Sequence, residues 1–144
     1  MAIEIKINPI DLQPDTAVGI DLPMMAGTGA TFKLNYTTLD QAIANAKNLL
    51  LTNKGERIMQ PEFGCDLRNT LFENITTDLV ETVEDRIRSN FNYWLPYIFI
   101  NTLNIVPYED VNRIDIKLVL SLMNNKFDTR SIQLQIVDTT ATVI

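Results

Sequence analysis

The chain has 144 residues, 46% of them hydrophobic and 21% charged, with a formal net charge of −6, which fits one acidic globular domain. It has no histidine and one cysteine, which excludes Ser-His-Asp triads, Cys-His pairs, intramolecular disulfides and CxxC metal sites. Nonspecific nucleic-acid binding needs clustered basic residues, so we expect no nucleic-acid partner. We also expect no cofactor and no bound metal.

Membrane association is not expected either. No segment reaches the roughly 20 consecutive apolar residues that span a bilayer. The first ten residues alternate apolar and charged side chains, without the cationic start and apolar run of a secretory signal. We therefore expect a protein that is made and assembled in the cytoplasm.

Residues 1–36 are predicted to form an extended N-terminal arm. This segment holds three of the 6 prolines and three of the 5 glycines, which interrupt regular elements. It is nevertheless too apolar to be left in water, so we expect it to lie on this domain or on a neighbouring chain. An ordinary N-terminal strand with loops of the same core is the alternative.

Two amphipathic helices follow. In the first, Thr38 is expected at the N-cap with Gln41 as its capping-box partner, and Gly55 is expected to end the helix. The second is expected to run from about Thr77 to just before Pro96. Each helix has one apolar stripe that predicts a buried face, made of Leu39, Ile43, Ala46 and Leu50 in the first and of Leu79, Val83, Ile87 and Phe91 in the second.

After the second helix the apolar period falls from about four to two, which predicts strands. We expect strands over residues 98–105, 114–122 and 131–137, with turns at 107–110 and 124–126. Because the helices precede the strands, the fold class is predicted as α+β, with two helices on one face of a three- to four-stranded, mainly antiparallel sheet. The α+β domain would cover residues 37–138 and a C-terminal tail residues 139–144. The last strand is expected at an open edge, where a strand from another chain could add, and the tail could itself pair outward.

Four acids near the centre of the chain raise the alternative of a glycoside hydrolase, which needs two carboxyl groups at the scissile bond. They are Glu56, Glu62, Asp66 and Glu73. They could equally be solvated or paired with the nearby Arg57 and Arg68. The lone Cys65 has no histidine to activate it, so it is expected to be a buried packing residue.

Three spaced segments resemble a known family. They read Lys-Gly-Glu-Arg at residues 54–57, Pro-Glu-Phe-Gly-Cys-Asp-Leu at 61–67 and Leu-Phe-Glu-Asn at 71–74. They resemble the baseplate wedge subunit of contractile-tailed bacteriophages, a family historically labelled lysozyme-like and shared with type VI secretion baseplates. The resemblance extends over residues 32–137.

The resemblance implies a structural role in the virion tail baseplate and no catalytic residue. Members of this family bind the helical core of the wedge and template the first ring of the contractile sheath, and their fold is similar to the conserved domain of the sheath protein. The implied partners are other wedge proteins, the tail sheath protein and the tail tube or hub proteins. A peptidoglycan hydrolase and an adaptor domain of another assembly are the alternatives.

Two groups of residues are predicted to form the interface. The signature loop comprises Gly55, Glu56, Arg57, Pro61, Phe63, Gly64, Asp66, Leu67 and Phe72. In it, the two glycines would allow turns, Phe63, Leu67 and Phe72 would anchor the loop to the core, and Arg57 would pair with Glu62 or Asp66. The second group is the wedge-core contact at Trp94, Leu95, Pro96 and Tyr97.

The wedge-core contact departs from the family pattern. Family members carry Glu-Pro-Arg where this chain has Leu95, Pro96 and Tyr97. We expect a hydrophobic contact to replace the charged one, because Trp and Tyr are enriched at interface hot spots. Packing of the aromatic group Tyr93, Trp94, Tyr97 and Phe99 at the end of the helix is the alternative.

Overall fold

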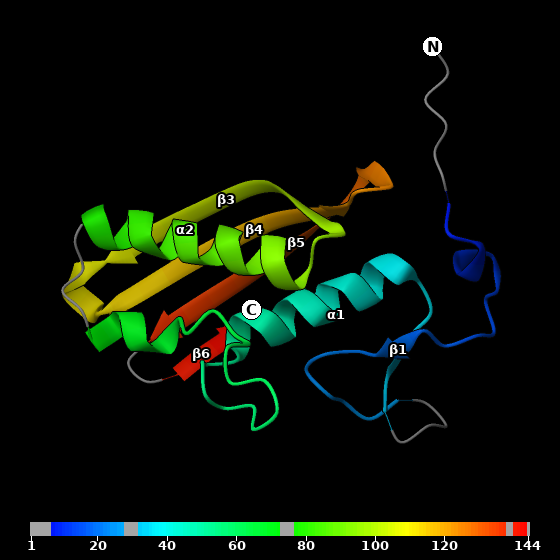
Figure 1. The fold of residues 1–144 in the computed structure, drawn as a ribbon, viewed down its shortest axis with the longest axis horizontal. Coiled ribbons are helices and arrows are strands. Elements are labelled where there is room, and N and C mark those ends of the chain that lie inside the picture. The colour runs from blue at the N-terminus through cyan, green and yellow to red at the C-terminus, as the bar shows by residue number, and fades with distance from the viewer. Residues whose placement is uncertain (1–6, 28–31, 73–76, 138–139, 144) are drawn as a thin grey trace, which may run out of the picture.

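The computed structural model describes residues 7–27, 32–72, 77–137 and 140–143, which form a helical layer on one face of a sheet (Figure 1). This confirms the α+β class, and a small second sheet is added by the N-terminal segment. The elements in chain order are η1 (Pro9–Leu12), β1 (Gly19–Ile20), β2 (Leu34–Asn35), α1 (Thr38–Leu51), η2 (Arg68–Phe72), α2 (Thr77–Trp94), β3 (Ile98–Tyr108), η3 (Glu109–Val111), β4 (Arg113–Leu122), β5 (Asn125–Val137) and β6 (Thr140–Val143).

The main sheet is a meander of four antiparallel strands in the order β3-β4-β5-β6. Alternate residues of β4 point into the core, as the period of two predicts. The turn expected at residues 107–110 begins later, because Pro107 lies in β3 opposite Ile114. Proline is tolerated there because β3 is an edge strand and needs no ladder bond on its outer side.

The ends of α1 differ from the prediction by a few residues. The N-cap is Thr37 and not Thr38, and its Oγ1 accepts a hydrogen bond from the backbone N–H of Asp40 at 3.1 Å. Thr38 is instead held by Asp11 of the N-terminal segment, which accepts bonds from its N–H and its hydroxyl at 2.7 Å each. The helix ends at Leu51 with Thr52 in an extended conformation, so Gly55 is not its cap.

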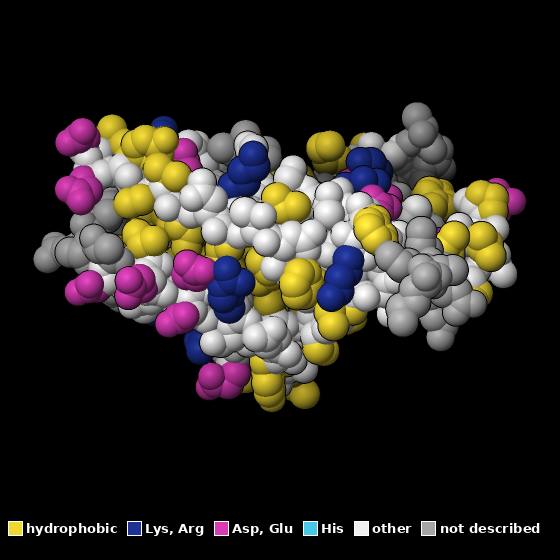
Figure 2. Space-filling view, turned by 90° about the horizontal axis from the view of Figure 1, so that it is seen from above, with side chains coloured by type: hydrophobic (Ala, Val, Ile, Leu, Met, Phe, Trp, Pro, Cys, Tyr) yellow, Lys and Arg dark blue, Asp and Glu magenta, His cyan; other side chains and the backbone are white. Residues whose placement is uncertain are grey.

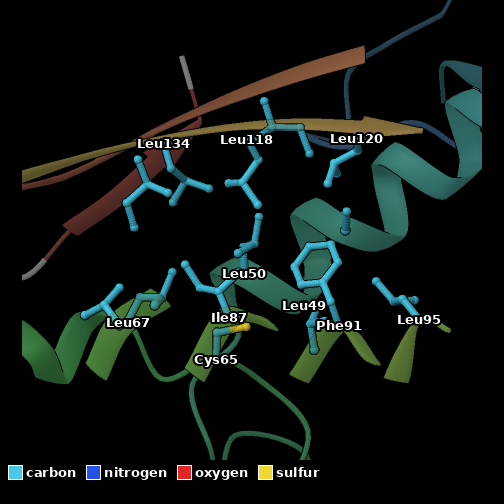
Figure 3. Close-up of a cluster of buried hydrophobic side chains, with 14 of the residues drawn as sticks. Leu49, Leu50, Cys65, Leu67, Ile87, Phe91, Leu95, Leu118, Leu120 and Leu134 are labelled. Carbon is cyan, nitrogen blue, oxygen red and sulfur yellow. The ribbon is translucent and has the colours of Figure 1, made fainter. Parts of the chain in front are cut away.

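The core lies between the two helices and the inward face of the sheet. Figure 3 shows side chains of α1 and α2, such as Leu50 and Phe91, pointing toward Leu118 and Leu120 of β4. All of these side chains are 1% exposed or less. The predicted stripes therefore face the core, although Ile43 is only partly buried against it.

The N-terminal segment docks on a second face of α1 within the same chain. Besides the Asp11 contact, Lys47 donates to the carbonyl of Leu22 at 2.6 Å and Asn35 donates to Gln41 at 3.1 Å. Ala44, which lies outside the main core cluster, is 1% exposed. The outer side of the segment still presents apolar side chains, including Ile7, Ile10, Leu12, Ile20, Met24, Met25 and Phe32.

The docked segment contains an ion pair that predicts a pH dependence. Lys33 lies 2.7 Å from Asp21 and holds the pKa of this carboxyl below its ordinary value of 3.8. A carboxyl with a lowered pKa stabilises the folded form above its ordinary pKa and loses this contribution as the pH falls through the lowered value. We expect Asp21→Asn to loosen the β1–β2 pair near neutral pH, and the difference from wild type to disappear well below pH 3.8.

The amide signals of Gly19 and Ile20 in NMR spectra report on this pairing between pH 6 and pH 2.5. Asp15→Asn serves as the control, because Asp15 is an exposed carboxyl of the same segment. Identical pH profiles for the two variants would contradict the role of Asp21.

Candidate interaction surfaces

The loop between α1 and η2 projects away from the helical layer (Figure 1) and is held by its own hydrogen bonds. Gly55, at a φ of 87°, donates its N–H across the loop to the carbonyl of Pro61 at 2.7 Å. The Glu56 carboxylate accepts bonds from the backbone N–H and side-chain amide of Asn53, both at 3.0 Å. These contacts confirm the expected turn at Gly55 and show that Glu56 stabilises the loop.

The base of the loop runs closely along the end of α1. Gly64 has a φ of 122°, and a Cβ atom there would collide with the backbone carbonyl of Thr52. The next residue, Cys65, donates its N–H to the carbonyl of Leu49 at 3.2 Å. Burial raises the pKa of its thiol to about 12, so the thiol stays protonated and unreactive. Cys65 is therefore the packing residue that was expected.

Arg57 does not form the expected ion pair with Glu62 or Asp66. Its guanidinium lies 3.7 Å from the centroid of the Phe63 ring, where the flat cation stacks on the aromatic face. Glu62 instead lies 4.0 Å from the Lys54 ammonium, and Asp66 accepts a bond from the side chain of Asn69 at 2.6 Å.

Two of the three expected anchors of the loop reach the core. Phe63 is 8% exposed and Leu67 is 1% exposed, and both belong to the main cluster. Phe72 is the last residue of η2, and its side chain lies outside the described part of the structure, as does Glu73.

The end of α2 meets the loop, which joins the two predicted groups into one surface. The ring of Trp94 packs edge-on against Phe63 at 5.2 Å and against Tyr93 at 4.9 Å between centroids. We call Arg57, Phe63, Trp94 and Tyr93 the aromatic ridge. Its outer member Tyr93 is 77% exposed, so the ridge reaches from the core to the surface.

One residue of the predicted wedge-core contact is not available to a partner. Leu95 is 7% exposed and belongs to the core, because the chain turns there between α2 and β3. Pro96 is exposed, and Tyr97 is 42% exposed while its hydroxyl accepts a bond from Asn45 at 2.9 Å. The surface that a partner can reach is therefore Tyr93, Trp94, Pro96 and Tyr97.

Sequence reasoning overlooked Ile58 and Met59 at the tip of the loop. They are 96% and 91% exposed, the highest values among the large hydrophobic side chains of the described residues. The available signal was two adjacent large apolar residues in a segment that is otherwise polar or punctuated by glycine and proline.

The sheet has two different edges. The edge expected at β5 is partly closed, because β6 pairs with Leu134–Val137 in the same chain and does not point outward as a free tail. Within the described residues, the part of β5 from Asn125 to Gln133 has a strand only on its β4 side. The other edge is β3, whose pairing with β4 shifts register between Ile100 and Thr102.

A cavity of about 370 Å³ adjoins the open part of β5. Arg130, Ser131 and Ile132 of β5 line one side, and residues of α1 and the N-terminal segment line the other. Its lining combines apolar side chains such as Ile43 with the charged groups Asp21, Lys33, Asp40 and Lys47. The exposed backbone of β5 thus faces a space with both apolar and charged walls.

The three acids proposed for a hydrolase that the structure describes do not form an enclosed pair; the fourth, Glu73, lies outside the described residues. Glu62 has a side chain that is 83% exposed, Glu56 is bonded to Asn53, and neither these residues nor Asp66 line the cavity beside β5 or a larger cavity near the start of α1. A general acid needs an apolar enclosure that raises its pKa, whereas the pKa of Asp21 in the smaller cavity is lowered. The described geometry therefore gives no support to carboxylate catalysis.

The larger cavity, of about 560 Å³, is also built from side chains with structural partners. Its carboxylates are Asp11, which accepts bonds from the N–H and hydroxyl of Thr38, and Asp128, which lies 3.2 Å from Arg130. Within the described residues, no three potential metal-ligating side chains gather into a group.

The visible charge pattern does not match that of a nucleic-acid interface. Figure 2 shows most of the visible acidic side chains toward one end of the face seen from above, with a few elsewhere, and Lys and Arg side chains spaced singly. A nucleic-acid surface would gather the basic groups. Among the helices of the described part of the chain, none is long and apolar enough to cross a bilayer.

Comparison with known proteins gives consistent results. A family model described as baseplate wedge protein gp25 matches residues 38–126. Baseplate wedge protein gp25 of Enterobacteria phage T4 is 37% identical over 98 residues, which cover 65% of this chain and 74% of that protein.

Two solved structures share the fold. One is a protein from Geobacter sulfurreducens to which a tail lysozyme role has been attributed, with a TM-score of 0.58 and 21% identity over 67% of this chain and 87% of that chain. The other is a chain of the anti-feeding prophage baseplate, with a TM-score of 0.55 and 18% identity over 84% of this chain and 85% of that chain. At these identities the two likenesses establish the fold alone. The family match over more than half of the chain, together with the identity to the phage T4 protein, shows that this chain belongs to the gp25 family of baseplate wedge proteins.

Proposed function

We propose that this chain is a structural subunit of a phage tail baseplate wedge, on which the first ring of the contractile sheath is built. The observation that carries the proposal is membership in the baseplate wedge family, combined with a sheet whose edges are incompletely paired. In this role the protein joins other wedge proteins, the sheath protein and the tube or hub proteins in the virion tail. It performs no reaction of its own.

The open part of β5 is the proposed acceptor for a sheath strand. Backbone groups on the free side of residues 125–133 lack a neighbouring strand in the described structure, and an added strand would satisfy them. The cavity beside Arg130–Ile132 gives space for alternate side chains of the incoming strand. Main-chain bonds would provide affinity and the cavity walls would provide selectivity.

The β3 edge is the weaker acceptor. Pro107 has no N–H to donate, and the register shift between Ile100 and Thr102 interrupts the regular spacing of backbone groups. Such features discourage strand addition at an edge. The pairing of β5 with β4 also shifts, between Asn125 and Thr129, but it is regular from Thr129 to Gln133 and contains no proline. We therefore assign the sheath contact to β5 rather than β3.

The surface of Tyr93, Trp94, Pro96 and Tyr97 is the proposed contact with the wedge core. Trp94 packs against Phe63, Tyr93 packs against Trp94, and the hydroxyl of Tyr97 accepts a bond from Asn45, so each aromatic side chain has a contact that orients it. In this chain an apolar contact would take the place of the charged contact made by the Glu-Pro-Arg motif of other family members. Leu95 contributes only by packing in the core.

Removal of the protein from the phage tests the proposed function. Particles that lack this chain should lack sheathed tails, and supplying the wild-type chain should restore them; electron microscopy of purified particles measures both. The variant Glu62→Gln should restore tails as well as wild type does, because this carboxylate is exposed and lies at no enclosed site. Normal sheathed tails without the protein would contradict the proposal.

A further inference from the structure

The loop tip contains two side chains for which packing within the chain gives no reason. Ile58 and Met59 are 96% and 91% exposed at the outer end of the loop, so they contribute almost no buried area to the fold. Isolated exposed apolar residues are ordinary, but two adjacent ones on a projecting loop form a compact apolar tip.

Backbone hydrogen bonds within the loop support the tip. Gln60 donates its N–H to the carbonyl of Arg57 at 3.2 Å, and Phe63 donates to the carbonyl of Gln60 at 3.1 Å. Together with the bond from Gly55 to Pro61, these contacts close the loop directly below Ile58 and Met59. A preordered tip loses little conformational entropy on binding, which favours its use as an anchor.

The charge at the base of the tip indicates what a partner must offer. Arg57 stacks on Phe63 and has no carboxylate within 4.0 Å among the described residues. The two acids nearest in sequence are occupied, since Glu56 accepts bonds from Asn53 and Glu62 pairs with Lys54. A carboxylate on the partner could therefore bind the free edge of the guanidinium.

The two cavities described above are poor receptors for the tip on a second copy of this chain. The acids that line them are engaged: Asp11 with Thr38, Asp21 with Lys33, and both Asp40 and Asp128 with Arg130. A copy that took the tip into either cavity would have to break one of these contacts to bind Arg57. This favours a different protein as the partner.

We propose that Arg57, Ile58 and Met59 form an anchor that inserts into an apolar pocket of another baseplate protein, with a carboxylate at the rim of the pocket. The proposal rests on the proposed function, because it places the partner in the same assembly. It is separate from the β5 edge and adjoins the aromatic ridge through the stacking of Arg57 on Phe63. The loop tip and the aromatic ridge thus form one continuous surface that ends at Tyr93.

Competition during assembly tests the anchor. Cells that produce the phage express the wild-type chain together with either Ile58→Ser/Met59→Ser or the apolar control Ile58→Leu/Met59→Leu, and mass spectrometry measures the ratio of variant to wild type in purified tails. We expect the serine variant to be depleted about tenfold or more, as for loss of interface hot spots, and the leucine variant to be incorporated nearly as well as wild type. Equal incorporation of the serine variant would overturn the proposal.

Two further measurements separate loss of the anchor from loss of folding and identify the partner. Thermal unfolding of the purified serine variant should match wild type, because both replaced side chains are exposed. A photo-crosslinking residue at position 59 should mark, in assembled baseplates, a peptide of another protein with apolar residues next to Asp or Glu. Crosslinking to a second copy of this chain, or to a basic polar peptide, would overturn the inference, whereas absence of the wild-type chain from tails would instead overturn the proposed function.

Discussion

Gly64→Ala should destabilise the folded chain by roughly 3–5 kcal/mol, because a left-handed backbone and a steric collision act at the same position. The φ of 122° disfavours any L side chain, and the new Cβ would collide with the backbone carbonyl of Thr52. That carbonyl cannot move freely because it also accepts a bond from the N–H of Asp66 at 3.4 Å. Urea denaturation followed by circular dichroism measures the change.

Gly55→Ala is the matched control for the same substitution. Gly55 also has a positive φ, of 87°, but no atom lies within 4 Å of the position where its Cβ would be. Only the conformational penalty applies, so the expected loss is about 1 kcal/mol. If both variants lost the same free energy of unfolding, the close contact of Gly64 with the end of α1 would not contribute to stability.

Phe91→Ala should reduce the free energy of unfolding by roughly 3–5 kcal/mol. The ring is 1% exposed and points from α2 toward the core that both layers share (Figure 3). Removal of the ring leaves a cavity between elements that hydrogen bonds and neighbouring side chains hold apart, so the site cannot fully collapse. Chemical denaturation at equilibrium again measures the difference.

Tyr93→Ala is the control on the same helix, because it shows how much stability is lost when an exposed aromatic side chain of α2 is removed. Tyr93 is 77% exposed and touches only the edge of the aromatic ridge, so its loss should change stability by about 1 kcal/mol or less. A loss as large as that of Phe91→Ala would contradict the assignment of the core.

The regular elements were predictable because their periodicity reports directly on burial. The four-residue spacing from Leu79 to Phe91 and the alternation from Ile114 to Leu120 both identify faces that the structure buries. Element ends were less predictable, since they depend on contacts that are distant in sequence. Thr38 resembled an N-cap, but Asp11, 27 residues earlier, occupies its hydrogen-bonding groups.

The edges of the sheet were also hard to predict, because they depend on contacts between distant parts of the chain. β6 falls in a short segment that contains threonine and valine and suits a strand, but the sequence does not show that its partner is β5 of the same chain. Pro107 looked like a turn residue, yet an edge position allows it to remain in β3.

The interaction residues were partly predictable. The loop glycines and the side chains of Phe63 and Leu67 behave as expected. A glycine in a loop indicates a turn with a positive φ, and a large apolar residue in a loop indicates a contact with the core. The predicted ion-pair partner of Arg57 was wrong, because its guanidinium stacks on the ring of Phe63, a contact that the spacing of nearby acids does not reveal. Exposure of Ile58 and burial of Leu95 likewise depend on the path of the chain.

The most direct test is a density map of the assembled baseplate with its first sheath ring, at side-chain resolution. We predict that the backbone of another subunit continues the sheet along β5, next to residues 125–133 and in line with β6. A map in which this edge faces only solvent, with the sheath attached elsewhere, would contradict the account.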